Sequence, residues 1–115
     1  MKTQQEARKP PAHAAPLLRE CKRIIQRFLP DATVILYGSL ARGTAGPESD
    51  WDLLILTDKH LTSAEERQVG DAIYDLELEH RLVISDYFCS REEWEAPVSR
   101  GGPFHENVER EGIVI

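Results

Sequence analysis

Basic residues are fewer than acidic residues in this sequence, and long apolar runs are missing from it. The 115 residues include 14 lysines and arginines against 20 aspartates and glutamates, which gives a net charge of -6. Neutralising the phosphates of duplex nucleic acid requires a basic face, so this balance argues against a protein that grips a duplex. It does not exclude a nucleotide substrate, because metal ions can bring a triphosphate to a cluster of carboxylates.

Few cysteines and short apolar runs predict a cytoplasmic protein that is not inserted in a membrane. Cys21 and Cys89 lie far apart and match no metal-ligand spacing, so we expect free thiols. No apolar run approaches the ~20 residues that cross a bilayer, and residues 1–6 lack the apolar core of a signal peptide. Polar, proline-bearing residues 1–16 predict a flexible N-terminal arm, and residues 17–115 predict a single domain.

Two kinds of apolar pattern alternate along this domain. Apolar residues recur at three- and four-residue spacing over 17–29 and 62–79, which predicts amphipathic helices. Apolar, partly β-branched runs at 33–37, 50–57 and 82–89 predict strands. This order favours an α+β fold of α/β character, with a small mixed β-sheet covered by helices.

Local signals predict how these elements begin and how the chain ends. Thr62 and Ser90 are each followed three residues later by glutamate, which is the signature of a capped helix start. A short helix is expected around Trp94, and a last helical turn over residues 104–110. Residues 113–115 are apolar and must dock on the domain.

The residues that suggest a chemistry lie between the first two predicted strands. Gly38 and Ser39 end one strand, and after ten further residues Asp50 and Asp52 begin the next. A glycine leaves room for a phosphate to approach the backbone. We expect Ser39 to cap a short helix, whose first amides and whose Arg42 would face the same phosphates.

Asp50 and Asp52 are separated by one residue, so on a strand both would project to one face, about 6–7 Å apart. Two like charges on one face repel each other unless a cation lies between them, and Mg²⁺ prefers such carboxylates together with phosphate oxygens. Taken singly, these pieces have ordinary interpretations as a turn, a helix cap or a surface ion pair. A calcium loop is excluded because four apolar residues follow Asp52.

Residues 37–43 (YGSLARG) and 48–55 (ESDWDLLI) resemble the signature of the DNA-polymerase-β-like nucleotidyltransferase superfamily, and most closely its minimal nucleotidyltransferases. The close resemblance covers residues 34–57, and the order of elements is compatible from residue 17 to residue 89. It implies a catalytic domain alone that binds a nucleoside triphosphate, ATP above others, with two Mg²⁺ ions and with Mn²⁺ as an alternative.

The resemblance also implies roles for individual residues. Gly38, Ser39 and Arg42 would hold the triphosphate, and Asp50 and Asp52 would bind the two metals. A third carboxylate on a later strand would complete the second metal site and act as base. We expect Asp86 in that role, because a charge that alternates with Ile84 and Phe88 is costly unless it is paired or binds metal. Its weaker substitutes are Glu77 and Glu79.

The implied activity is transfer of a nucleoside monophosphate, AMP above others, to a hydroxyl acceptor with release of pyrophosphate. A chain of this length has little room to bind an acceptor. The acceptor-binding surface would therefore come from a second copy in a homodimer or from a separate protein, such as a small helical HEPN-like partner. The alternative is a degenerate, non-catalytic nucleotide-binding module or antitoxin-type regulator of such a partner. An antibiotic-modifying transferase is disfavoured, because the chain lacks a domain to enclose a drug.

Overall fold

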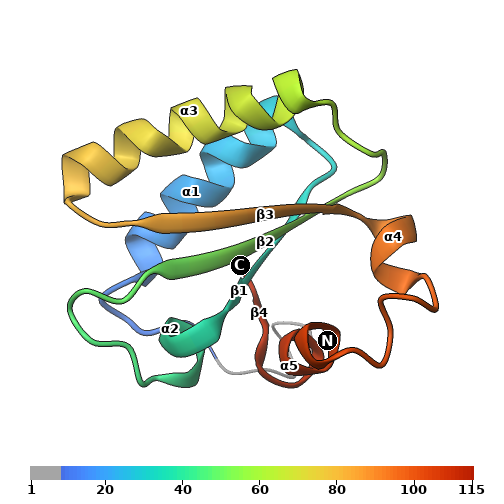
Figure 1. Ribbon diagram of the computed structural model, residues 1–115. Coiled ribbons are helices and arrows are strands. Elements are labelled where there is room, and N and C mark those ends of the chain that lie inside the picture. The colour runs from blue at the N-terminus through green and yellow to red at the C-terminus, as the bar shows by residue number, and fades with distance from the viewer. Residues whose placement is uncertain (1–8) are drawn as a thin grey trace.

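The computed structural model describes residues 9–115, which form helices on both sides of one sheet (Figure 1). In chain order the elements are α1 (Ala15–Phe28), β1 (Thr33–Tyr37), α2 (Gly38–Arg42), β2 (Trp51–Thr57), α3 (Ser63–His80), β3 (Ile84–Ser90), α4 (Arg91–Glu95), α5 (Pro103–Glu111) and β4 (Ile113–Val114). None of the helices within residues 9–115 is long and apolar enough to cross a membrane.

The sheet is mixed, as expected from the order of elements. Its strand order is β3-β2-β1-β4, with β2 parallel to β3 and both other pairs antiparallel. A parallel pair needs a crossover connection, and α3 supplies it. The predicted α+β class with a small mixed sheet covered by helices is therefore confirmed.

Alternation along β2 divides the core between the two faces of the sheet. Leu53 and Ile55 pack with residues of α1 and α3, on what we call the α1/α3 face. Leu54 and Leu56 pack with residues of α4 and α5, on the opposite α4/α5 face. All four side chains are buried, so the register of β2 is held from both faces.

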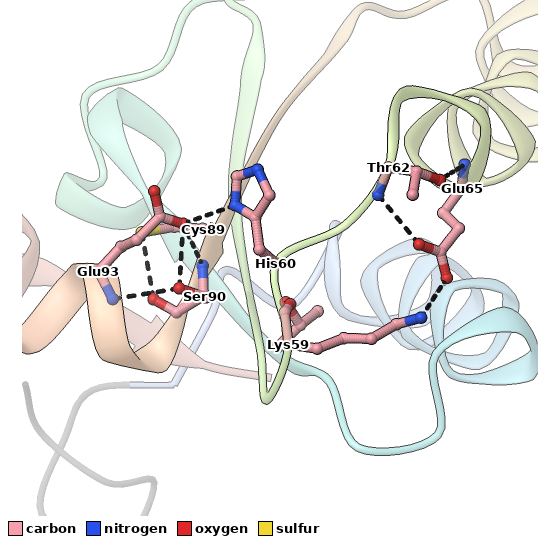
Figure 2. Close-up of polar contacts among 8 residues, drawn as sticks. Lys59, His60, Thr62, Glu65, Cys89, Ser90 and Glu93 are labelled. Carbon is pink, nitrogen blue, oxygen red and sulfur yellow. Dashed lines mark hydrogen bonds and ion pairs between the residues drawn. The ribbon is translucent and has the colours of Figure 1, made fainter.

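The predicted helix starts are confirmed in both cases. Thr62 accepts from the N–H of Glu65, and the Glu65 side chain accepts from the N–H of Thr62, which closes a capping box on α3. Ser90 and Glu93 form the same box on α4 (Figure 2). His60 lies 3.1 Å from Glu93, so the loop before α3 also contacts α4.

Two local expectations were wrong. Ser39 does not cap α2, because the helix begins one residue earlier at Gly38 with Tyr37 as its N-cap residue. Helix α1 begins at Ala15, inside the expected arm, because Pro16 occupies the first turn of the helix, where its missing N–H costs nothing. Of the remaining arm, residues 1–8 lie outside the described residues.

The apolar C-terminus docks as an edge strand. Ile113 and Val114 pair with Leu36 and Ile35 of β1, and the N–H of Ile115 donates to the carbonyl of Val34. The sequence predicted that these residues dock but not that they form β4, since so short a run carries little periodicity. Docking of β4 holds α5 against the sheet.

Gly112, between α5 and β4, has no space for a side chain. A Cβ at this position would lie 2.5 Å from the Val108 carbonyl oxygen and 3.0 Å from Ile35. We therefore expect Gly112→Ala to lower the free energy of unfolding by about 1–3 kcal/mol in urea titrations. Gly46→Ala is the matched control, because its Cβ would meet only Ser49 at 3.9 Å. Equal stability of the two variants would contradict this packing.

Candidate active site

Gly38 allows the carboxylate of Asp52 to lie directly against the turn after β1. The residue has φ +79°, a left-handed conformation that favours glycine. A Cβ built on it would overlap the Asp52 oxygen Oδ2. The antiparallel register produces this approach, because Tyr37 lies opposite Asp52 and Gly38 follows at once. The structure therefore brings two of the predicted site residues together.

The surroundings of Asp52 disfavour its negative charge. Burial raises the pKa of Asp52, and the charge of Asp50 raises it further, while Arg42 acts in the opposite direction. Asp50 is exposed and immediately precedes β2. In the absence of a cation, the ionised form of Asp52 is thus disfavoured in the folded protein.

Arg42, at the end of α2, is held by the C-terminal helix. Its Nη1 donates to Oε1 of Glu111 at 3.1 Å. Glu111 is only 8% exposed, whereas the Arg42 side chain is 48% exposed. Ser39 is half-buried in the same short helix, and its carbonyl accepts from the N–H of Thr44 at 3.0 Å. The triphosphate residues predicted on α2 thus share one turn of helix.

Asp86 lies on the wrong face of the sheet for its predicted role. It is the register partner of Leu53 and therefore points to the α1/α3 face, whereas Asp52 points to the α4/α5 face. A Cβ on Gly70 of α3 would lie 3.9 Å from Oδ2 of Asp86. The expectation that Asp86 joins Asp50 and Asp52 is therefore corrected.

The substitutes for Asp86 also lie away from Asp52. Glu77 belongs to α3, on the α1/α3 side, and its Oε2 accepts from the N–H of Ile84 at 3.0 Å. Glu79 lies on the same helix and lines a surface hollow with His80 and Trp51. Neither carboxylate is placed to share a metal with Asp52.

Ser85 occupies the position on β3 directly across from Asp52. It is exposed and lies on the α4/α5 face, followed on that face by Tyr87. The sequence predicted no role for either residue, or for Tyr37 and Glu111. The alternation of β3 is visible in the sequence, but which of its faces meets Asp52 depends on the register of β2 with β3, for which the sequence carries no local signal.

The nucleotidyltransferase domain family matches the chain over residues 18–113. This chain belongs to that family. The resemblance carried by residues 37–43 and 48–55 is thereby confirmed, and nucleotidyltransferases are a class of transferases. The match covers every element described above in full except α1, whose first three residues it omits, and β4, of which it includes only the first residue.

One similar protein agrees with this assignment, and one solved structure shares the fold. A probable protein adenylyltransferase MntA of Haemophilus influenzae is 30% identical over 73 residues, which cover 64% of this chain and 64% of the length of that relative. A crystal structure of a toxin-antitoxin with AMP-PNP superposes with TM-score 0.59 and 14% identity, covering 84% of this chain and 69% of that one. At this identity the second likeness concerns the fold alone.

The carboxylates of this nucleotidyltransferase domain fit a magnesium ion whose other ligands are phosphate and water oxygens. Within residues 9–115 no group of three or more His, Cys, Asp or Glu could hold a metal by itself. Asp50 and Asp52 offer carboxylate oxygens only, and Mg²⁺ is usually bound by one or two carboxylates together with phosphate and water oxygens. A cation there would also relieve the repulsion between the two carboxylates.

Removing the charge of Asp86 tests its placement. Burial raises the pKa of Asp86, and Glu77 and Glu66 raise it further, so its ionised form destabilises the fold at neutral pH. We expect Asp86→Asn to raise the free energy of unfolding at pH 7 by about 0.5 kcal/mol, or about 2–4 °C in Tm. The gain should shrink as the pH falls through the raised pKa, because the wild-type carboxyl then becomes neutral. If Asp86 were a third metal ligand, the Asp86→Asn variant would instead lose nucleotide binding or transfer.

Proposed function

We propose that this chain transfers AMP from ATP to a hydroxyl group of a partner protein. The acceptor oxygen forms a bond to the α-phosphorus, and the bond from that phosphorus to the bridging oxygen breaks. Pyrophosphate leaves, and the proton of the acceptor hydroxyl passes to solvent water. The family assignment supports nucleotidyl transfer, and the name of the Haemophilus relative suggests AMP as the group and a protein as the acceptor.

The observation that carries this proposal is the contact between Gly38 and Asp52. It places a carboxylate beside a turn whose following N–H groups, in the first turn of a helix, lack intrahelical acceptors. Gly38, Ser39 and Arg42 would orient the β- and γ-phosphates, and Asp50 and Asp52 would hold Mg²⁺. The bound ion would neutralise charge on the phosphates and on the departing pyrophosphate.

A second candidate follows from the place of Asp86 on the other face. The residues of β3 on the α4/α5 face are Ser85, Tyr87 and Cys89, none of which is a carboxylate. A domain that binds a nucleotide without a positioned base would serve as a regulator of a partner protein rather than as an efficient transferase. Both candidates require the same nucleotide site, so binding is tested first.

Nucleotide binding should depend on magnesium, because Asp50 and Asp52 repel a triphosphate in its absence. At about 100 times its dissociation constant, ATP with Mg²⁺ should raise the free energy of unfolding by ~2.7 kcal/mol. ATP with excess chelator should give no such rise in thermal unfolding.

Asp52→Asn is the informative variant for this test. It should lose the stabilisation by ATP and Mg²⁺ and yet be more stable than the wild type without ligand, because burial and Asp50 disfavour the charge it removes. Asp86→Asn is its matched control and should respond to ATP as the wild type does. Equal affinity for ATP with Mg²⁺ and with chelator would sink the metal-bridged site.

Ser85→Asp separates the two candidate functions. It adds a carboxylate across from Asp52 on the correct face, so we expect transfer of label from α-labelled ATP to rise by about 10²-fold. Ser85→Asn, of the same size and without charge, should not raise it. Transfer by Ser85→Asp but not by the wild type would identify the natural protein as a binding module, and no gain over Ser85→Asn would contradict this placement of Ser85.

A further inference from the structure

Aromatic side chains from separate elements gather on the α4/α5 face. The ring of Phe104, at the start of α5, lies 5.2 Å from Tyr37 of β1 and 5.4 Å from Tyr87 of β3, measured between centroids. It also meets Trp94 of α4 edge-on at 5.8 Å. We call Tyr37, Tyr87 and Phe104 the aromatic platform.

Two rings of the aromatic platform are exposed to solvent, whereas the core residues beneath them are buried. Trp94 and Val108 are 3% and 0% exposed, whereas Tyr87 is 51% exposed and Phe104 38%. Core packing therefore accounts for the inner aromatic residue and not for the outer two. Adjacent exposed rings on one face are the kind of apolar surface that marks a ligand or partner.

The aromatic platform lies next to the turn at Gly38, where the proposed function places the triphosphate. Tyr37 is the register partner of Asp52 and the residue before Gly38. Tyr37 and Tyr87 both lie against the ring of Phe104, at 5.2 and 5.4 Å between centroids. Tyr87 follows Ser85 on the same face of β3, and both are exposed. Asp52, Tyr37 and Tyr87 thus lie on one face of the sheet, on three neighbouring strands, and both tyrosine rings contact Phe104.

We propose that the nucleobase of the bound nucleoside triphosphate stacks on Phe104 and Tyr87 of the aromatic platform. This proposal rests on the proposed function, which sets the phosphates at Gly38 and the metal at Asp52. A nucleobase is flat, apolar on its faces and tethered to the phosphates, and such surfaces stack well on aromatic rings. The aromatic platform offers no side-chain amide or carboxylate to read the base edge, so ATP and GTP should be affected alike.

The test compares ATP with inorganic tripolyphosphate, which has the phosphates but no base. Phe104→Leu keeps an apolar side chain to cover Trp94 and removes the ring, and Tyr87→Ala removes the most exposed ring of the aromatic platform. In calorimetry with Mg²⁺, each variant should bind ATP about 10-fold more weakly. Binding of tripolyphosphate should change less than 2-fold, and Tyr87→Phe should restore ATP binding.

Tyr74→Ala is the matched control, because Tyr74 is 56% exposed on α3, away from the α4/α5 face. Unchanged ATP binding in both platform variants, or equal weakening for ATP and tripolyphosphate, would overturn the stacking proposal and leave the nucleotide site standing. An unchanged dissociation constant for ATP with a raised KM for the protein acceptor would assign the rings to the acceptor instead. If the wild type binds neither ligand with Mg²⁺, the proposed function fails and stacking fails with it.

Discussion

The register of β2 between β1 and β3 is the constraint on which the rest of this molecule depends. Leu53, Leu54 and Ile55 are each fully buried. Leu53 and Ile55 form one set, packed against α1 and α3, and Leu54 belongs to the other set, packed against α4 and α5. A slip by one residue would exchange the two sets and bury Asp52 under helices. The same register sets Asp52 beside Gly38 and across from Ser85, so one packing requirement determines the composition of the site.

The site is held at an electrostatic cost that the fold offsets elsewhere. Burial and Asp50 disfavour the ionised form of Asp52. The carboxylate can approach the turn only because Gly38 has no side chain. Such local destabilisation is common where a ligand later supplies the missing partner. Capping boxes on α3 and α4, and the buried faces of β2, provide stability that does not depend on a ligand.

The C-terminal segment shapes the site although it lies far from the motif in sequence. Helix α5 supplies Glu111, which contacts Arg42, and Phe104, which contacts Tyr37. Strand β4 extends the sheet beyond β1 and, with the tight turn at Gly112, sets the position of that helix. Helix α5 therefore covers part of the α4/α5 face, on which Asp52 stays half-buried.

Local patterns in the sequence determined the element types, both capping boxes and the turn that carries Gly38, since each depends on residues close together in the chain. They also determined the family, through the spacing of Gly38, Asp50 and Asp52. Only the tertiary structure decided that Asp86 points away from Asp52 and that Ser85 points toward its face. Alternation along β3 was readable, but a strand has two faces, and which one meets the site is set by its pairing with β2. For the same reason the contacts of Glu111 and Phe104 could not be predicted, because they arise when α5 packs against elements distant in sequence.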